Sequence, residues 1–271
     1  MNYIAFIAGL PDISMDDRKL TLTVHDFREQ ARDYIEGKDE RLLQLFFLPN
    51  DNMQVLRLLQ KQEPDSGLQT VYPLKQLEEE VQDPSRELPA YLGQFIADFK
   101  DEHLKYEVAP ENVLSWMYYD YMMACGNRLV SRYAEFSMNL KNLVTAVNCR
   151  KYDRDVAREI IGDNEFSNAL RTSGSKDFGL AGDYPYVEKV VALMDEGNLV
   201  ARERGLDMMI WDFLDEAVVF EYFSMDVVIC FLLKLMIVER WSRMSSESGR
   251  EVFMEMVRKF RESFQFEEQF K

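Results

Sequence analysis

The chain has 271 residues, of which 47% are hydrophobic and 13% aromatic, so it can bury a substantial core and is not expected to be disordered. Aspartate and glutamate (48) outnumber lysine and arginine (32), which gives a formal net charge of −16. Because this charge repels phosphate backbones and anionic headgroups, we expect neither nucleic-acid binding nor electrostatic attachment to a membrane.

The cysteines and the N-terminus predict a cytoplasmic protein. Cys125, Cys149 and Cys230 form no CxxC pair, and their odd number leaves at least one without a disulfide partner. Buried, reduced thiols are therefore expected. The apolar run over residues 1–11 has no basic stretch before it, and aspartates follow where a signal peptide would need small residues for cleavage.

Residues 1–108 are predicted to form an N-terminal helical lobe. Residues 3–10 and 19–24 have apolar patterns that allow a short β-hairpin. Thr23 is a typical N-cap residue for the helix that follows, which we expect to end at Gly37. Further helices are predicted in the stretches 39–48, 53–59, 74–81 and 91–99, the first of them stopping before Pro49.

A middle helical region is predicted over residues 109–184 and a C-terminal helical lobe over residues 185–271, the three regions forming one continuous body. The middle region begins with a long helical stretch over residues 110–152, with a break near Gly126, and continues with a helix over 153–161. Residues 171–184 have the composition of a loop. The C-terminal lobe contains a helix that follows Pro185 and helices over 198–222, 225–244 and 246–264, so the class is all-α with ten or eleven helices.

One of these helices is apolar almost all round. Between Val227 and Val238 only Lys234 is polar, and the run then ends at Glu239, Arg240 and Arg243. Twelve helical residues span roughly 18 Å, which is short of the roughly 30 Å hydrocarbon core of a bilayer. We therefore predict a central helix of a helical bundle and no direct membrane insertion.

No set of residues in the sequence predicts catalysis, a metal site or a cofactor. Only two histidines occur, His25 and His103, and no HExxH or ExxH motif is present. The run Ser173-Gly-Ser-Lys176 contains residue types of a phosphate cradle without the spacing of a P-loop. The functional alternative is a metal-dependent or small-molecule-binding helical enzyme that uses four carboxylates of one predicted helix, namely Asp207, Asp212, Asp215 and Glu216; a solvated acidic face is the preferred interpretation.

Two segments resemble the stalk-connector family of V-type and A-type rotary ATPases, whose members occur in archaea, bacteria and eukaryotes. The first runs Ser137-Met-Asn-Leu-Lys-Asn-Leu-Val-Thr-Ala-Val-Asn-Cys-Arg-Lys151 and is similar to a recurrent helix of that family. The second is the apolar helix over residues 222–241 with its ending Lys-Leu-Met-Ile-Val-Glu-Arg, which is similar to the family's last long helix. The resemblance covers roughly residues 110–265, and the chain is short for the family.

This resemblance implies a funnel of helical lobes and a non-catalytic connector. Family members link the central stalk to the proteolipid ring on the cytoplasmic face of the membrane and so couple ATP turnover to ion transport. The implied partners are therefore stalk proteins and the ring, and the acidic surface suits a basic stalk. Five residues of the two segments are candidates for either a structural role, which we prefer, or partner contact: Asn139, Asn142, Arg150, Glu239 and Arg240.

Overall fold

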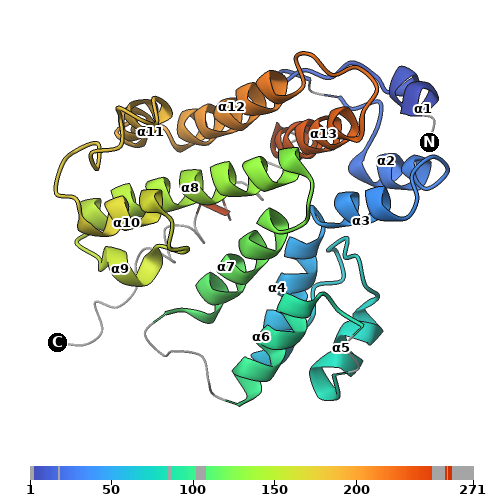
Figure 1. Ribbon diagram of the computed structural model, residues 1–271, viewed down its shortest axis with the longest axis horizontal. Coiled ribbons are helices and arrows are strands. Elements are labelled where there is room, and N and C mark those ends of the chain that lie inside the picture. The colour runs from blue at the N-terminus through green and yellow to red at the C-terminus, as the bar shows by residue number, and fades with distance from the viewer. Residues whose placement is uncertain are drawn as a thin grey trace. The chain divides into compact units, whose positions relative to one another are not determined.

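The computed structural model describes residues 3–17, 19–84, 87–101 and 108–245 together with positions 254, 256 and 257. The elements in these described residues are thirteen α-helices, without a β-strand among them (Figure 1). The predicted all-α class is confirmed. Contacts within the chain divide it into two compact units, Met1–Gly37 with Phe213–Lys271 and Lys38–Asp212. The three consecutive regions expected from the sequence stay a prediction.

The first unit is built from both ends of the chain around α13 (Met225–Ser245). Helices α1 (Tyr3–Gly9) and α2 (Val24–Ala31) both contact α13. The ring of Phe27 on α2 stacks on that of Phe231, with centroids 5.7 Å apart. Full burial of apolar side chains along α13 confirms the predicted central helix; these side chains include Val228, Ile229, Leu232, Leu235 and Val238.

The predicted N-terminal β-hairpin is wrong. Residues 3–9 form helix α1, and residues 19–23 contain bends without a strand. In α1 only Phe6 is buried, and its ring packs on Phe27 at 5.5 Å and on Tyr34 at 5.2 Å. A β-strand at a core would alternate buried and exposed residues, whereas in α1 only this one aromatic side chain is buried. The tertiary contacts of this ring therefore outweigh the strand propensity of the segment. Leu22 and Val24 are both buried, but Val24 already begins α2.

The second unit contains two groups of packed helices. In the first group α4, α6 and α7 pack against one another, and α5 packs against α4; in the second, α8 contacts α7, α9, α10 and α11. The bounds are α3 (Lys38–Gln44), α4 (Leu48–Leu59), α5 (Leu74–Gln82), α6 (Ala90–Lys100), α7 (Pro110–Met123), α8 (Arg128–Lys151), α9 (Val156–Glu159), α10 (Glu165–Thr172), α11 (Tyr186–Met194) and α12 (Leu199–Ala217), the last continuing into the first unit.

A core cluster of buried side chains surrounds the second half of α8. Helices α10 and α11, which contribute members to it, contact α8 (Figure 1). Leu143 and Ala146 on α8 are fully buried, and they share the cluster with Phe166 and Leu170 of α10 and with the buried face of α11. The aromatic rings of Phe166 and Tyr184 meet edge to face at 4.9 Å. This packing places the polar residues of α8 beside the chain between α9 and α11.

Several helix boundaries differ from those predicted. Pro49 does not stop a helix but lies in the first turn of α4, where its missing N–H is harmless. The break near Gly126 is confirmed, since Gly126 has φ +82° between α7 and α8. The predicted helix over 153–161 is reduced to the four residues of α9, capped by Asp155, and the predicted pattern lacks α10, which Asn164 caps.

The described helices include none that is both long and apolar enough to cross a membrane. The predicted helix over residues 246–264 falls almost entirely outside the described residues, as does His103.

Candidate functional site

Asn142 on α8 holds the chain between α9 and α10 against that helix. Its carboxamide nitrogen donates to Ile161 O at 2.7 Å and to Ser167 Oγ at 3.1 Å, and its oxygen accepts from Ile161 N at 3.1 Å. The side chain is buried, and Ser167 Oγ also donates to Ile161 O at 3.0 Å. The preferred structural interpretation therefore fits Asn142, because its amide is occupied by protein groups on both ends.

Asn139 lies one helical turn before Asn142 and supports a helix cap. Its oxygen accepts a hydrogen bond from Asn164 Nδ2 at 3.0 Å. Asn164 Oδ1 in turn accepts from Ser167 N at 2.8 Å and so caps α10. Asn139 is buried, so it positions the capping residue from the core side.

Arg150, near the end of α8, holds the loop after α10. Its guanidinium donates to the carbonyl oxygens of Ser173 and Ser175, and its central carbon lies 3.5 Å from the centroid of the buried Phe178 ring. The run Ser173–Lys176 thus directs carbonyl oxygens at a positively charged side chain. A phosphate-binding loop would instead direct N–H groups at an anion. Phe178 has φ +57°, a left-handed conformation that these contacts help to maintain.

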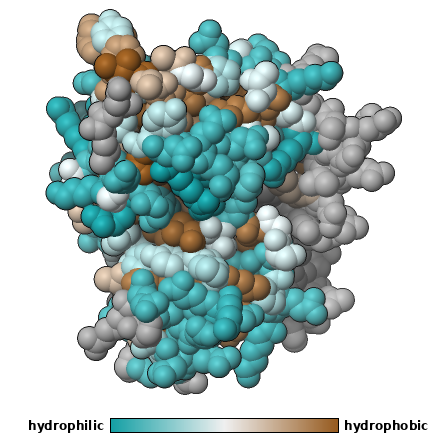
Figure 2. All heavy atoms as spheres, turned by 90° about the vertical axis from the view of Figure 1, so that its right-hand side faces the viewer, coloured by the Kyte–Doolittle hydropathy of each residue, from teal (hydrophilic) through white to brown (hydrophobic). Residues whose placement is uncertain are grey.

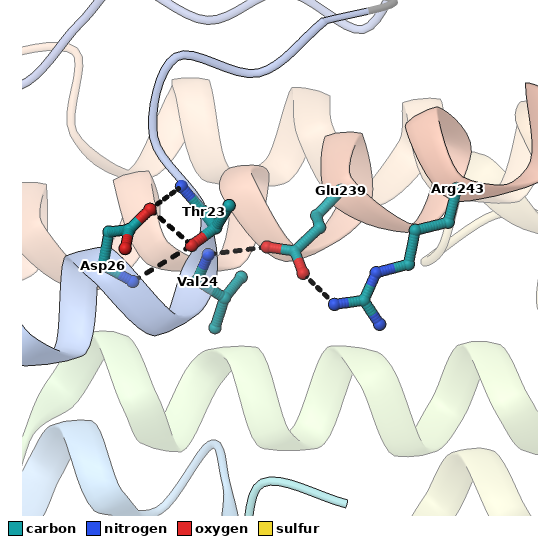
Figure 3. A network of polar contacts seen from close by, with 5 residues as sticks. All are labelled: Thr23, Val24, Asp26, Glu239 and Arg243. Atoms are coloured by element: carbon teal, nitrogen blue, oxygen red, sulfur yellow. Dashed lines mark hydrogen bonds and ion pairs between the residues drawn. The ribbon is translucent and has the colours of Figure 1, made fainter. Parts of the chain in front are cut away.

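Glu239 on α13 caps α2 from a distant part of the chain (Figure 3). Its Oε2 accepts from Val24 N, the first amide of α2, at 2.6 Å, and its Oε1 accepts from Arg243. Thr23 and Asp26 form a capping box at the same helix start: Asp26 N donates to Thr23 Oγ1 at 3.1 Å and Thr23 N donates to Asp26 Oδ2 at 3.3 Å.

The electrostatics of this helix start are consistent with capping. The hydrogen bonds from Thr23 lower the pKa of Asp26 below its usual value, since they favour the charged carboxylate. Two carboxylates thus lie where the helix dipole is positive. The sequence predicts the N-cap at Thr23 but not the role of Glu239, because 215 residues separate it from Val24. Arg240 is exposed on α13.

The four candidate carboxylates of α12 are divided between buried and exposed positions. Asp207 is buried, Asp212 and Glu216 are exposed, and Asp215 is bonded to Lys234. The part of the chain that the structure describes contains no group of three or more histidine, cysteine or acidic side chains placed to hold a metal ion. His25 lies exposed in the first turn of α2. The enzyme alternative built on these carboxylates therefore has no geometric support in the described residues.

The three cysteines are free thiols, two of them buried. Burial raises the pKa of Cys149, and it raises that of Cys230 to about 12. Since the thiolate is the reactive form, these two residues have the properties of core side chains.

The turn between α12 and α13 exposes a group of apolar side chains that sequence reasoning missed. The helix predicted to reach Tyr222 ends at Ala217, and Glu221 N then bonds to Val218 O at 2.9 Å. Phe220 is 87% exposed and Tyr222 is 72% exposed, with Val219 and Phe223 also on the surface. Figure 2 shows hydrophobic atoms at the upper edge of the view, the end where Figure 1 draws this turn, and further hydrophobic atoms between hydrophilic ones lower down. The signal in the sequence is a run of bulky apolar residues, which is equally typical of a buried helix end.

A family model for DUF2764, described as a protein of unknown function, matches residues 1–263. The chain belongs to this family. The matched residues contain all thirteen helices described above, together with both segments that resemble the stalk-connector family. No curated protein and no solved structure matches the chain. The match to DUF2764 therefore covers both compact units up to residue 263, but the description of this family names no activity and no partner.

Proposed function

We propose that this chain is a non-catalytic connector in a V-type rotary ATPase, linking the central stalk to the membrane proteolipid ring. In this role it transmits rotation between the two and so couples ATP turnover to ion transport. It binds peripherally on the cytoplasmic face of the complex.

The observation that carries this proposal is the use of polar residues in the two segments that resemble the stalk-connector family. Asn142 and Arg150 hold two successive connections to α8, and Glu239 holds the start of α2 to α13. A connector that transmits torque must resist local deformation. The bonds of Asn142 and Glu239 are buried and supply that resistance, because breaking them leaves polar groups unsatisfied.

The charge of the chain supports the same role. A net charge of −16 favours encounter with a basic protein surface and disfavours contact with other polyanions. A stalk tip with basic residues would be such a surface.

Binding to purified ATPase parts tests the proposal. The full chain is immobilised and exposed separately to the central-stalk proteins and to the detergent-solubilised proteolipid ring of the V-type ATPase from the same organism. We expect both to bind with dissociation constants of about 1 μM or lower. An unrelated acidic protein of similar net charge is the control for binding by charge alone. Failure of both parts to bind in this range would overturn the proposal.

Coupling provides a second measurement. An ATPase complex stripped of this chain is expected to hydrolyse ATP without transporting ions, and addition of the purified chain is expected to restore transport. Ion transport that does not depend on the chain would contradict a connector role.

A further inference from the structure

The two most exposed large apolar side chains of the described residues lie together in one turn. Phe220 and Tyr222 are the extreme cases, and Val219 and Phe223 flank them. Elsewhere in the described residues, exposed bulky apolar side chains are scattered over several helices, as is usual for protein surfaces. We call residues 218–224 the aromatic turn.

Both ends of the aromatic turn are held by the core. Leu214, before it on α12, is fully buried, and Met225, the first residue of α13, is also buried. Between these anchors the hydrogen bond from Glu221 N to Val218 O fixes the first part of the turn. The turn is thus held at a defined place while its side chains are exposed to solvent, so little backbone entropy remains to be lost when they are covered.

The charges around the turn limit what can cover it. Between positions 212 and 226 the chain carries five carboxylates and no lysine or arginine. Asp215 is bonded to Lys234, while Glu216 and Glu221 are exposed. An apolar tip with a negative border disfavours anionic lipid and a second copy of this acidic chain, and it fits an apolar pocket with a basic border.

We propose that the aromatic turn is a docking element that inserts Phe220 and Tyr222 into an apolar, basic-bordered pocket of a protein partner. The choice of the central stalk as that partner rests on the proposed function. Aromatic side chains that become fully covered in such a pocket contribute a large share of the affinity of an interface, whereas the acidic border contributes mainly to the rate and specificity of association.

The test compares the affinity of variants for the purified central-stalk proteins. The double variant Phe220→Ser with Tyr222→Ser is expected to bind roughly tenfold or more weakly than the wild-type chain. The matched control is Tyr152→Ser, which removes a half-exposed ring from the other unit and should leave the affinity unchanged. Circular dichroism and thermal melting are expected to be the same for all three proteins, because the altered side chains are exposed.

A charge variant tests the border separately. Glu221→Lys is expected to slow association and to reduce the dependence of the association rate on NaCl concentration, whereas Glu188→Lys on α11, also exposed, is expected to do neither. This variant keeps both aromatic rings, so it remains informative even if the double variant folds poorly.

The outcomes separate this inference from the proposed function. If the wild-type chain binds the stalk and both turn variants bind equally well, the docking element is wrong and the connector role stands. If the wild-type chain binds neither stalk nor ring, both fall. Loss of binding to vesicles of phosphatidylcholine and phosphatidylserine, or loss of self-association in sedimentation experiments, on mutation of the turn alone would overturn a protein partner in favour of lipid or of a second copy.

Discussion

At the residue scale, Asn142 has its polar groups bonded within the fold. Its carboxamide is buried and bonds to both backbone groups of Ile161 and to Ser167. The resemblance to the stalk-connector family includes this position in one of its two segments. In the structure its side chain holds the chain between α9 and α10, a role that involves no other protein.

We predict that Asn142→Ala lowers the free energy of unfolding by about 2–3 kcal/mol, because it leaves buried donors and acceptors without partners. Urea denaturation measures this change. Asn148→Ala on the same helix is the control, since its side chain makes no hydrogen bond in the described part of the chain, and it should cost about 0.5 kcal/mol or less. Equal costs for the two variants would show that Asn142 is not specially required.

Buried tyrosines give the stability a predictable dependence on alkaline pH. Burial raises the pKa of Tyr118 well above its ordinary value, and Tyr118 Oη donates to Leu45 O at 3.0 Å. In the unfolded chain tyrosine ionises near pH 10. A group with a raised pKa in the folded state stabilises it below the unfolded pKa and loses that contribution as pH rises.

We therefore expect the free energy of unfolding to fall as pH rises above about 10. Urea denaturation at pH 8 and at about pH 10.5 measures the decline. Tyr118→Phe should be less stable at pH 8, by about 1 kcal/mol for the lost hydrogen bond, and should decline less steeply. Cys230, whose pKa is about 12, contributes to both proteins alike. Identical declines would exclude Tyr118 as a source.

At the scale of elements, α2 depends on a cap supplied from α13. Thr23 and Asp26 satisfy part of its N-terminus locally, and Glu239 accepts from Val24 N across the unit (Figure 3). Helix α13 therefore supplies a capping group for α2. The two helices are held together by this buried hydrogen bond as well as by the packing of Phe27.

We predict that Glu239→Ala destabilises the chain by about 1–2 kcal/mol, since Val24 N loses its acceptor at a helix N-terminus. Glu239→Gln retains an acceptor and should cost less. Arg243→Ala is the matched control: its side chain is 73% exposed, so removal of this ion pair should cost about 0.5 kcal/mol or less. The hypothesis fails if chemical denaturation finds Arg243→Ala more damaging than Glu239→Ala.

At the scale of the whole molecule, the two ends of the chain belong to the same compact unit. The first unit joins residues 1–37 to the segment after position 212, while the unit between them is continuous. Helices α1 and α2 contact α13, whose residues 227–238 are apolar except for Lys234, so the N-terminal segment is needed to complete the first unit.

Removal of residues 1–37 is therefore expected to expose apolar surface of α13, including the ring of Phe231. Binding of the dye ANS by the truncated chain should rise several-fold, and co-expression of residues 1–37 as a separate peptide should reverse the rise. A truncated chain that melts cooperatively without binding the dye would contradict this account of the unit.

The sequence by itself determined the features that depend on residues a few positions apart. The all-α class, the cap at Thr23, the break at Gly126 and the buried helix α13 all follow from helical periodicity and from capping preferences. Asn142 and Arg150 were singled out by the resemblance to the stalk-connector family, and the sequence did not indicate their hydrogen-bond partners.

Only the tertiary structure decided the features that depend on distant contacts. The packing of Phe6 on Phe27 made a helix of a segment with strand character, and Glu239 came to serve a helix start 215 residues away. The run from Val219 to Phe223 was exposed instead of buried. Hydrophobicity along a chain indicates which residues favour burial, but the geometry of packing decides which of them are buried in the core and which stay at the surface.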